Sequence, residues 1–312
     1  MKFGTIRKND RDVVVAGVGH DTALVLEDVM DDAPKTMLEV IAGGEAMRRR
    51  IAAAVAGREG TPMDGLHWLP PVPRPGKVLC VALNNSANKD RIMSGPKHPA
   101  MFVKASSSLI GHGQPIRLRA EFGRVHPEPE LAVIIGKAGS DIAPEDAMEH
   151  VFGYSIINDL TSPTMRGEDT FHYRAIHPKE GDASTIEYVD TWVSYPGRYK
   201  CADTFGPIGP WVVAKEAVAD PHDLTVRCEH QGELVTEDNT TNLFYKIRDV
   251  VSFASTYMAL EPGDIISMGT ALKAAGATRG KAVQNIDLNQ LGGPISVSIS
   301  ELGTLSNPVE WR

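Results

Sequence analysis

Residues 125–137 read V-H-P-E-P-E-L-A-V-I-I-G-K, in which two glutamates two positions apart precede an apolar run. Side chains of an extended strand alternate between its two faces, so Glu128 and Glu130 point to the same side. Pro127 and Pro129 lack amide donors, which places the strand start at an edge or a mouth of a sheet. Two carboxylates in so small a volume repel each other unless they share a proton or a cation. The stretch therefore indicates a divalent metal site or a coupled acid pair, with a solvated strand end as the remaining alternative.

Length and charge limit the classes of protein to be considered. The chain has 312 residues, enough for about two domains with a buried core. A formal net charge of -8 argues against nucleic-acid and anionic-membrane partners, although a local basic site for an anionic substrate remains allowed. No apolar run approaches the roughly 18 residues of a membrane span. The three cysteines are widely spaced and favour a reducing compartment, so we expect a cytoplasmic protein.

Hydrophobic periodicity divides the chain into two expected domains. Residues 1–70 read as a small N-terminal α+β domain, with three strands and a helix over residues 36–56 that a glycine pair weakens in its middle. Residues 68–76, W-L-P-P-V-P-R-P-G, are typical of a stiff extended linker. Residues 71–312 show many short strands and one amphipathic helix, over residues 243–258. We therefore predict an α+β, mostly β fold.

Five motifs, in order along the chain, resemble a known family. They are the opening stretch, G-Y-S-I-I-N-D at 153–159, Y-K-C-A-D-T-F-G-P-I-G-P-W at 199–211, L-E-P-G-D-I-I-S-M-G-T at 260–270 and E-L-G-T-L-S-N-P-V at 301–309. Over about residues 76–309 the chain resembles the C-terminal catalytic domain of the fumarylacetoacetate hydrolase family. The resemblance implies a mixed β-roll or β-sandwich catalytic domain and a homodimer.

The same resemblance implies a metal site. Glu128, Glu130 and Asp159 match the family's three acidic ligands residue for residue. Ligation by oxygen alone selects Mg²⁺, or else Mn²⁺ or Ca²⁺, whereas zinc would draw on His or Cys. A cation held in this way can chelate a 2-oxo acid through its ketone and carboxylate and polarise the carbonyl. The site thus indicates a chemistry rather than one substrate.

Further residues match family positions at the substrate. Lys200 matches the active-site lysine, whose charge would offset negative charge on an enolate. Thr270 matches the position whose hydroxyl and amide help to hold the substrate carboxylate, and Gly269 allows close backbone approach. Lys104 and Tyr154 lie in matching segments and are candidate substrate contacts. The structural alternatives are a surface lysine at 200, a plain strand-end turn at 270 and a snorkelling lysine at 104.

One departure from the family pattern concerns the catalytic base. The family commonly carries a histidine with a glutamate three residues on, and this pair activates the attacking water. Here Asn88 and Arg91 stand at those positions. An amide cannot accept a proton at neutral pH, so the usual hydrolytic base is missing and Asn88 is only a candidate substrate contact.

A second departure is the long connection over residues 161–199, between Asp159 and Lys200. We expect it to lack strong secondary structure and to form a mobile cover over the metal site or a dimer arm, with a solvated surface excursion as the alternative. Its His172 and His177 are candidate bases. His126, which shares a strand face with Glu128, is another candidate, or merely a neighbour of the ligands.

These observations predict a divalent-metal-dependent enzyme for a 2-oxo or 1,3-diketo carboxylic acid. The first interpretation is hydrolysis of a carbon–carbon bond in an acylpyruvate or fumarylacetoacetate type of substrate, as in the catabolism of aromatic compounds. A decarboxylase, isomerase or dehydratase of a similar acid is the alternative, which the missing base favours because those reactions need less activation of water. A protein that binds metal and metabolite without turnover is the alternative of another class.

Overall fold

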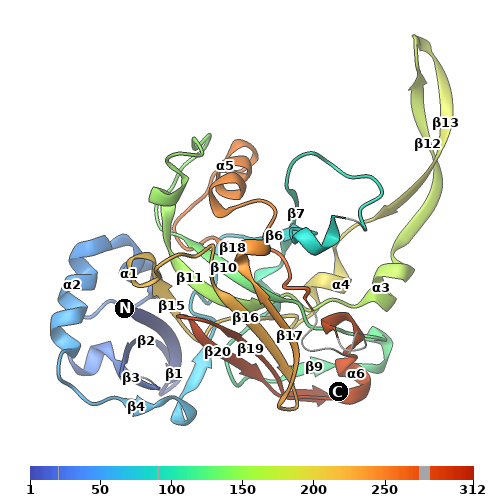
Figure 1. Ribbon diagram of the computed structural model, residues 1–312. Helices are drawn as coiled ribbons and strands as arrows, with labels where there is room; N and C mark the ends of the chain where they lie inside the picture. The colour runs from blue at the N-terminus through green and yellow to red at the C-terminus, as the bar shows by residue number, and fades with distance from the viewer. Residues whose placement is uncertain (20, 90, 274–281) are drawn as a thin grey trace.

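The structure is a computed structural model that describes residues 1–19, 21–89, 91–273 and 282–312 (Figure 1). Among these residues, one sheet has eleven strands and a second sheet has four, and helices are short. The predicted α+β, mostly β fold is confirmed. Short 3-10 helices lie in the loops: η1 (Leu26–Asp28), η2 (Met63–Gly65), η3 (Ser86–Asn88), η4 (Ser106–Ser108), η5 (Ala120–Phe122), η6 (Ala147–His150), η7 (Lys215–Ala217), η8 (Thr240–Asn242) and η9 (Val283–Asn285).

The N-terminal strands form one end of the large sheet. They are β1 (Lys2–Lys8), β2 (Arg11–Val18), β3 (Thr22–Val25), β4 (Thr61–Pro62) and β5 (His67–Leu69). Two helices, α1 (Met37–Ala42) and α2 (Gly44–Val55), occupy the span where one helix was expected. Gly44 has a φ of +55°, a left-handed conformation that interrupts the helix at the glycine pair.

The N-terminal strands continue directly into the rest of the sheet. β1 pairs antiparallel with β15 (Val212–Ala214), with Phe3 opposite Val212. The proline-rich residues 68–76 are packed rather than free, because Trp68 is buried and meets the ring of Trp211 edge-on at 4.7 Å between centroids. This contact fixes the position of the stretch that was expected to be a linker.

The middle of the large sheet carries the functional residues. Beyond β15 it continues through β11 (Val151–Asn158), β10 (Pro129–Ile135), β18 (Ile265–Ser267), β6 (Val78–Ala82) and β7 (Ala100–Lys104). Every residue of β10 is buried, and the strand lies between β11 and β18. Of the two positions inferred from the prolines, an edge or a mouth of the sheet, the edge is therefore wrong. Pro129 is tolerated in a central strand because it is the first residue, where a missing amide breaks no ladder.

A second layer covers one face of this sheet. The four-stranded sheet runs in the order β17 (Glu233–Asn239), β16 (Thr225–His230), β19 (Ile295–Ile299) and β20 (Gly303–Asn307), and it contacts β10 and β11. Helix α5 (Ile247–Tyr257) lies on the opposite side of β10 and contacts η6 (Figure 1). Smaller pairs and one helix complete the body: β8 (Leu109–Ile110) with β14 (Gly206–Pro207), β9 (Ile116–Leu118) with β21 (Val309–Trp311), and α6 (Leu288–Leu291).

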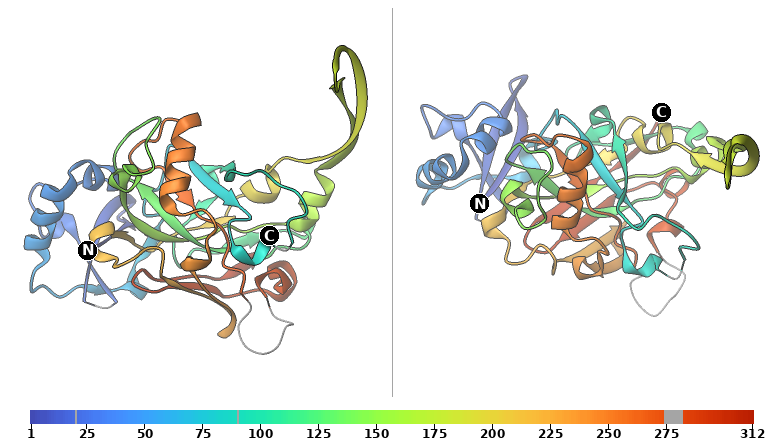
Figure 2. Two further views of the ribbon diagram at one scale, coloured as in Figure 1. Left: turned by 45° about the horizontal axis from the view of Figure 1, so that its top comes forward. Right: turned by 90° about the horizontal axis from the view of Figure 1, so that it is seen from above.

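The connection over residues 161–199 is a regular hairpin, which corrects the expectation of weak secondary structure. After α3 (Pro163–Glu168), strands β12 (Thr170–Lys179) and β13 (Asp182–Ser194) pair with each other alone and project away from the body (Figures 1 and 2). The chain returns through α4 (Arg198–Cys201). Arg198 fixes the base of the hairpin through ion pairs with Glu168 at 2.5 Å and Asp169 at 2.8 Å.

Candidate metal centre

The start of β10 and the end of β11 bring three carboxylates together. The two strands are in register with Pro129 opposite Asn158, and the amide of Asp159 donates to the carbonyl of Glu128 at 2.9 Å. The amide of Glu128 in turn donates to the side-chain oxygen of Asn158 at 2.8 Å. One carboxylate oxygen from each of Glu128, Glu130 and Asp159 lies within 4.8 Å of the others. Two adjacent strand ends thus create the site.

Donors from the end of β18 and from the turn after it hold the Glu130 carboxylate. Its Oε2 accepts hydrogen bonds from the Ser267 hydroxyl and from the Gly269 amide, the latter at 2.8 Å, and its Oε1 accepts one from the Thr270 hydroxyl at 3.0 Å. Burial, followed by the charges of the two neighbouring carboxylates, raises the pKa of Glu130 to about 8. Without a cation, Glu130 therefore retains a proton at neutral pH, as expected for crowded carboxylates.

Two buried lysines balance the charges of the other two carboxylates. Lys200 Nζ donates to Glu128 Oε2 and to Asp159 Oδ2, at 2.6 Å each. Lys104 Nζ donates to the carbonyl oxygen of Lys200 and lies 3.0 Å from Asp159 Oδ1. Burial lowers the pKa of Lys200, but the carboxylates outweigh it and raise that pKa above its ordinary value, so the ammonium stays charged.

Asp159 is the carboxylate most firmly held in its charged form. Burial opposes ionisation, yet Lys200 and then Lys104 keep the pKa of Asp159 below its ordinary value. Its Oδ1 is buried and accepts no hydrogen bond of good geometry, although the Lys104 ammonium is near. This oxygen remains available to a cation. Three hard oxygen donors, which carry one negative charge more than the two ammonium groups once Glu130 is ionised, fit Mg²⁺, Mn²⁺ or Ca²⁺.

His126 lies at the rim of the carboxylate cluster. Its Nδ1 donates to the carbonyl of Pro127 at 3.3 Å, so Nε2 is the basic nitrogen, and it lies 3.9 Å from Glu128 Oε1. Burial lowers the pKa of His126, with Glu128 opposing. The imidazole is therefore neutral at neutral pH and can accept a proton beside the ligands.

Asn88 lies in η3 on a neighbouring loop and is buried. The Arg91 guanidinium approaches its side-chain oxygen at 3.4 Å, so the two residues that replace the family pair lie beside each other. Asn84, earlier in this loop, donates to the carbonyl of Met268 at 2.8 Å and ties the loop to the turn that holds Glu130. Among the described residues, no hydrogen bond or ion pair joins Asn88 to the three carboxylates.

Three of the residues expected at the site lie elsewhere. Tyr154 is buried within β11, and its phenol faces Asp220 and Glu216 on the far side, where burial first and then these charges raise its pKa. His172 and His177 are exposed on the projecting hairpin, and His172 stacks on Trp192 at 4.0 Å between centroids. The hairpin extends away from the body (Figure 2), and its strands pair only with each other among the described residues.

Sequence reasoning missed Ser267 and Asp238. Ser267 could have been found from strand alternation, since it shares a face with Gly269 in I-I-S-M-G-T. Buried Asp238 accepts hydrogen bonds from the amides of Leu272 and Lys273, at 2.8 and 3.1 Å, and from the Asn85 side chain at 3.0 Å. It therefore fixes the chain beyond Thr270 to the loop of Asn88. No sequence motif around Asp238 indicates this role.

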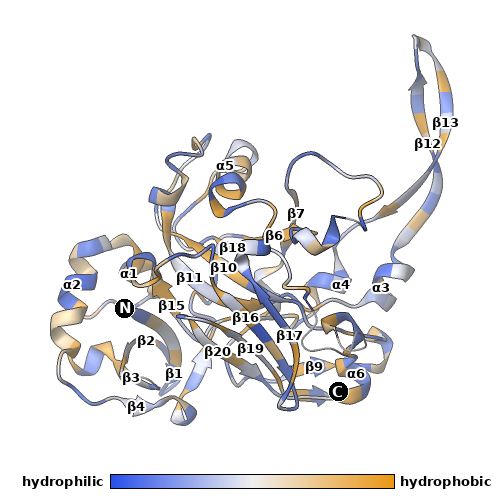
Figure 3. Cartoon of the chain, viewed as in Figure 1, coloured by the Kyte–Doolittle hydropathy of each residue, from blue (hydrophilic) through white to orange (hydrophobic). Residues whose placement is uncertain are grey.

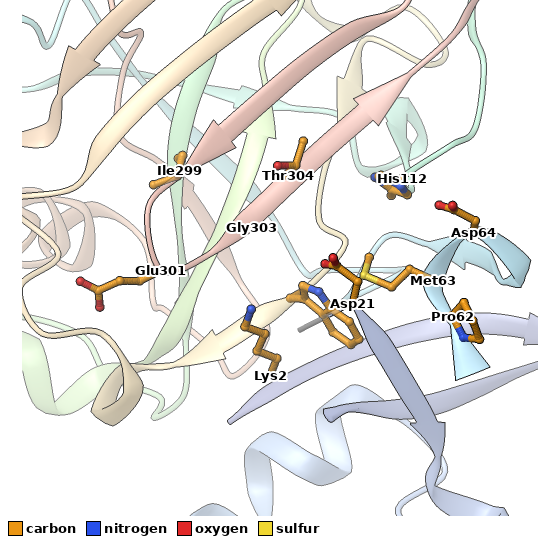
Figure 4. Close-up of a pocket in the computed structure, with 11 residues that line it drawn as sticks. Lys2, Asp21, Pro62, Met63, Asp64, His112, Ile299, Glu301, Gly303 and Thr304 are labelled. Carbon is orange, nitrogen blue, oxygen red and sulfur yellow. The ribbon is translucent and has the colours of Figure 1, made fainter. Parts of the chain in front are cut away.

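A separate cavity lies far from the carboxylates. It has a volume of about 520 Å³ and lies between the N-terminal strands and the turn that joins β19 to β20 (Figure 4). Its lining includes Lys2, Asp64, Trp211 and Glu301, and also His112, whose Nδ1 accepts from the Ser306 amide at 3.1 Å. None of the three clustered carboxylates lines this cavity.

The paired strands, the three carboxylates and the two lysines define the class: a metal-dependent enzyme with an all-oxygen ligand set. The sequence profile Fumarylacetoacetate (FAA) hydrolase C-terminal matches residues 77–310. The chain belongs to the fumarylacetoacetate hydrolase family, as its motifs indicated.

Relatives in this family carry out several reactions. The mitochondrial oxaloacetate tautomerase of Xenopus laevis is 32% identical over 278 residues, which cover 88% of this chain and 79% of the relative. Maleylpyruvate hydrolase from Sphingobium sp. SYK-6, solved with manganese(II) and pyruvate, has a TM-score of 0.73 and 26% identity, with coverage of 100% and 99%. The 5-carboxymethyl-2-hydroxymuconate delta-isomerase from Mycobacterium smegmatis has a TM-score of 0.68 and 26% identity, also with coverage of 100% and 99%.

Within the described part of the chain, no helix has the length and apolar character that crossing a membrane requires.

Proposed function

We propose that this protein moves a proton between carbon and the enol oxygen of a small 2-oxo acid, as an enol–keto tautomerase of the oxaloacetate type. The observation that carries the proposal is the combination of a complete ligand set with Asn88 and Arg91 in place of the water-activating pair. Tautomerisation consumes no water, so it does not need that pair. The substrate class follows from two buried ammonium groups beside a cation site, which suit an acid with adjacent carbonyl and carboxylate oxygens.

Glu128, Glu130 and Asp159 would hold a divalent cation, which when bound acts as a Lewis acid on the substrate carbonyl. Lys200 keeps a permanent positive charge beside two of these ligands, where it offsets negative charge that develops on the enolate oxygen. Lys104 holds Asp159 and the backbone of Lys200 in place. Gly269 and Thr270 are committed to Glu130, so their amide and hydroxyl orient a ligand.

His126 is the proposed proton carrier. Its neutral Nε2 takes the proton from the carbon next to the ketone, and the electron pair of the broken C–H bond forms the enolate. The imidazolium then returns the same proton to the enolate oxygen. The enol is released, and the reverse sequence gives the ketone, so no other reactant enters or leaves.

The name of the Xenopus relative supports this choice, since that protein is an oxaloacetate tautomerase and is similar to 88% of this chain. The test is the interconversion of enol and keto oxaloacetate, followed by ultraviolet absorbance, with Mg²⁺, Mn²⁺ or Ca²⁺ and with a chelator. Faster interconversion that needs the cation and is lost in Glu130→Ala supports the proposal. An unchanged rate with every cation contradicts it and leaves carbon–carbon hydrolysis, decarboxylation, dehydration or binding without turnover.

Carbon–carbon hydrolysis, the first interpretation from sequence, is the second candidate. The similarity to maleylpyruvate hydrolase over the whole chain favours it. Hydrolysis of an acylpyruvate would give two acids. Decarboxylation of oxaloacetate would give carbon dioxide, and dehydration of a related acid would give an unsaturated product. Proton NMR of the products separates these reactions. Three further predictions do not depend on whether the enzyme is a tautomerase or a hydrolase. They are Mg²⁺ as the resident cation, a homodimer and a cytoplasmic location.

A further inference from the structure

The hairpin β12–β13, together with Tyr195 directly after it, exposes eight large apolar side chains. The exposed fractions run from 40% to 70%, with Trp192 and Tyr195 at the upper end. Figure 3 shows the apolar residues recurring along both strands up to the middle of the hairpin. The set comprises Phe171, Tyr173, Ile176, Ile186, Tyr188, Val189, Trp192 and Tyr195.

These side chains lie on both faces of the hairpin. The cross-strand register places Phe171 opposite Val193 and Ala175 opposite Val189 on one face. On the other face Ile176 lies opposite Tyr188 and His172 opposite Trp192. A strand that is half-buried in its own protein is apolar on one face and polar on the other. Apolar residues on both faces indicate that both faces are covered in the functional state.

The hairpin cannot be stable through its own contacts. A two-stranded hairpin is marginally stable at best in water, and its two open edges can pair with other chains. Among the described residues, β12 and β13 pair only with each other. The base, in contrast, is fixed: Arg198 binds Asp169 at 2.8 Å, and the Ser162 amide donates to the carbonyl of Tyr199 at 3.1 Å. The body therefore sets the direction of a hairpin that needs an external partner.

The exposed area is large enough for a stable interface. An aromatic side chain buries roughly 150–250 Å² when fully covered, so the five aromatics of the hairpin offer on the order of 500–750 Å² at their exposed fractions. Three aliphatic residues, Ile176, Ile186 and Val189, add to this area. A standard interface takes about 800 Å² from each partner. One hairpin therefore supplies close to what one protomer contributes to a specific dimer.

The charges of the hairpin favour a second copy of the chain over a lipid surface. Glu180, Asp182, Glu187 and Asp190 outnumber the cations of the hairpin, and the whole chain carries -8, so an anionic membrane would repel it. The ion pair of Arg174 with Asp190 at 3.3 Å neutralises charge among the apolar residues. Such a surface can meet its own copy without strong repulsion.

We propose that the hairpin β12–β13 is an exchanged arm, which packs on a second copy of this chain while the arm of that copy packs on the first. Two-fold exchange gives every arm one partner and closes the assembly as a dimer. An apolar receiving surface lies beside the arm's base: Val103 is 53% exposed, and its carbonyl contacts the thiol of Cys201, next to Lys200. Met93, on the loop before β7, is 95% exposed and is a second apolar side chain available to a partner.

This arm has a consequence for the site whatever the reaction is. It leaves the body four residues after Asp159, at the start of α3, and its return helix α4 contains Lys200. A partner that holds the arm therefore also restrains the segment that carries the ammonium group between the ligands.

The test is the oligomeric state of the full chain, measured by sedimentation velocity over about a thousandfold range of concentration. We expect a dimer, and we expect Tyr188→Ser with Trp192→Ser to raise the dimer dissociation constant by at least 100-fold. Tyr257→Ser is the matched control, since this tyrosine is 69% exposed on the body, in α5, and should leave the constant unchanged. A second variant replaces residues 171–193 by a short Gly-Ser turn, in case the serine variant only unfolds the arm.

Hydrogen exchange across β12 and β13 gives an independent readout. We expect protection that increases with protein concentration and is absent in the Tyr188→Ser, Trp192→Ser variant. A monomeric wild type at all concentrations, or a dimer that survives removal of residues 171–193, overturns the proposal. Binding of a monomeric wild type to vesicles of phosphatidylcholine and phosphatidylserine would also overturn it in favour of a lipid surface. None of these measurements uses turnover, so they are independent of the proposed reaction.

Discussion

Lys200 Nζ donates hydrogen bonds to Glu128 Oε2 and to Asp159 Oδ2 at the same distance, 2.6 Å, and so joins a ligand before β10 to a ligand after β11. The ammonium group occupies oxygen lone pairs that a divalent cation would also use. It therefore stabilises the metal-free site and competes with the cation, while it supports the chemistry once both are present.

We expect Lys200→Met to lower kcat by a factor on the order of 10² to 10³, the usual effect of losing one charge-stabilising donor. The affinity for Mg²⁺ should be retained or increase, because a competing cation has been removed. Calorimetric titration and the tautomerase assay measure the two effects. Lys137→Met is the control, since Lys137 is exposed and 4.0 Å from its one ionic partner. A loss of metal affinity equal to that of a ligand variant would contradict this account.

Glu128→Ala, Glu130→Ala and Asp159→Ala should each abolish binding of the divalent cation and activity. Their stabilities should differ. Glu130→Ala relieves crowding of carboxylates, whereas Asp159→Ala leaves Lys104 and Lys200 short of a buried partner, at a cost of about 3–5 kcal/mol. Titration calorimetry with Mg²⁺ and Mn²⁺, together with urea unfolding, checks both statements. Unchanged affinity in all three variants would refute the metal assignment.

Asn88→His alone should not give strong hydrolysis of acylpyruvates, because a general base also needs a carboxylate to orient it. The double variant Asn88→His, Arg91→Glu should do better, since the two side chains already approach within 3.4 Å. Release of two acids, followed by NMR, is the measurement. If the single variant equalled the double variant, the argument from the missing pair would fail.

His126→Ala should lower kcat by a factor on the order of 10² to 10⁴, as expected for a positioned general base, with little change in metal affinity. His172→Ala and His177→Ala should keep the wild-type kcat at protein concentrations where the oligomeric state is unchanged, because both histidines lie on the hairpin. Single-turnover measurements separate the proton transfer from product release. A wild-type kcat in His126→Ala, together with a lowered kcat in either hairpin variant, would mean that the general base is His172 or His177.

Asp238 should make the stability of the protein depend on pH in the acid range. Burial tends to raise its pKa, but hydrogen bonds from Asn242 and from three backbone amides outweigh burial and lower the pKa. A carboxyl group with a lowered pKa stabilises the fold above its unfolded pKa of about 3.9, and the contribution is lost as pH falls through the folded value.

Asp238→Asn should therefore lower the free energy of unfolding by about 1–3 kcal/mol at pH 7, the cost of leaving buried donors poorly paired. The difference from the wild type should shrink below about pH 4. Chemical unfolding at several pH values is the measurement, with the exposed Asp10→Asn as control. A difference that stays constant down to pH 3 would rule out titration of Asp238 as the cause.

The local sequence was sufficient for the strands around the site, and the family resemblance was needed to group Asp159 with Glu128 and Glu130. The apolar runs P-E-L-A-V-I-I and V-F-G-Y-S-I-I-N are local signals, and they located β10 and β11, which are buried along their whole length. The ion pairs of Lys200 could not be predicted from local sequence, because they join residues 41 and 72 positions apart. The hairpin was missed for a different reason. Its apolar residues fall on both faces of the strands, so the sequence lacks the apolar–polar alternation that identifies a half-buried strand.

Gly269 links the part of the site that this family keeps to the part in which this chain differs. Its φ is +104°, and a Cβ there would lie 2.8 Å from the Cβ of Asn84. One missing methyl group thus sets the spacing between the turn that grips Glu130 and the loop that bears Asn88. A side chain at 269 would therefore press on the loop and on the turn together, and under the proposed function we expect substitutions within the loop to affect the reaction while the ligands stay in place. Under that proposal, the loop of Asn88 can vary with the reaction, whereas the turn that holds Glu130 must keep its geometry.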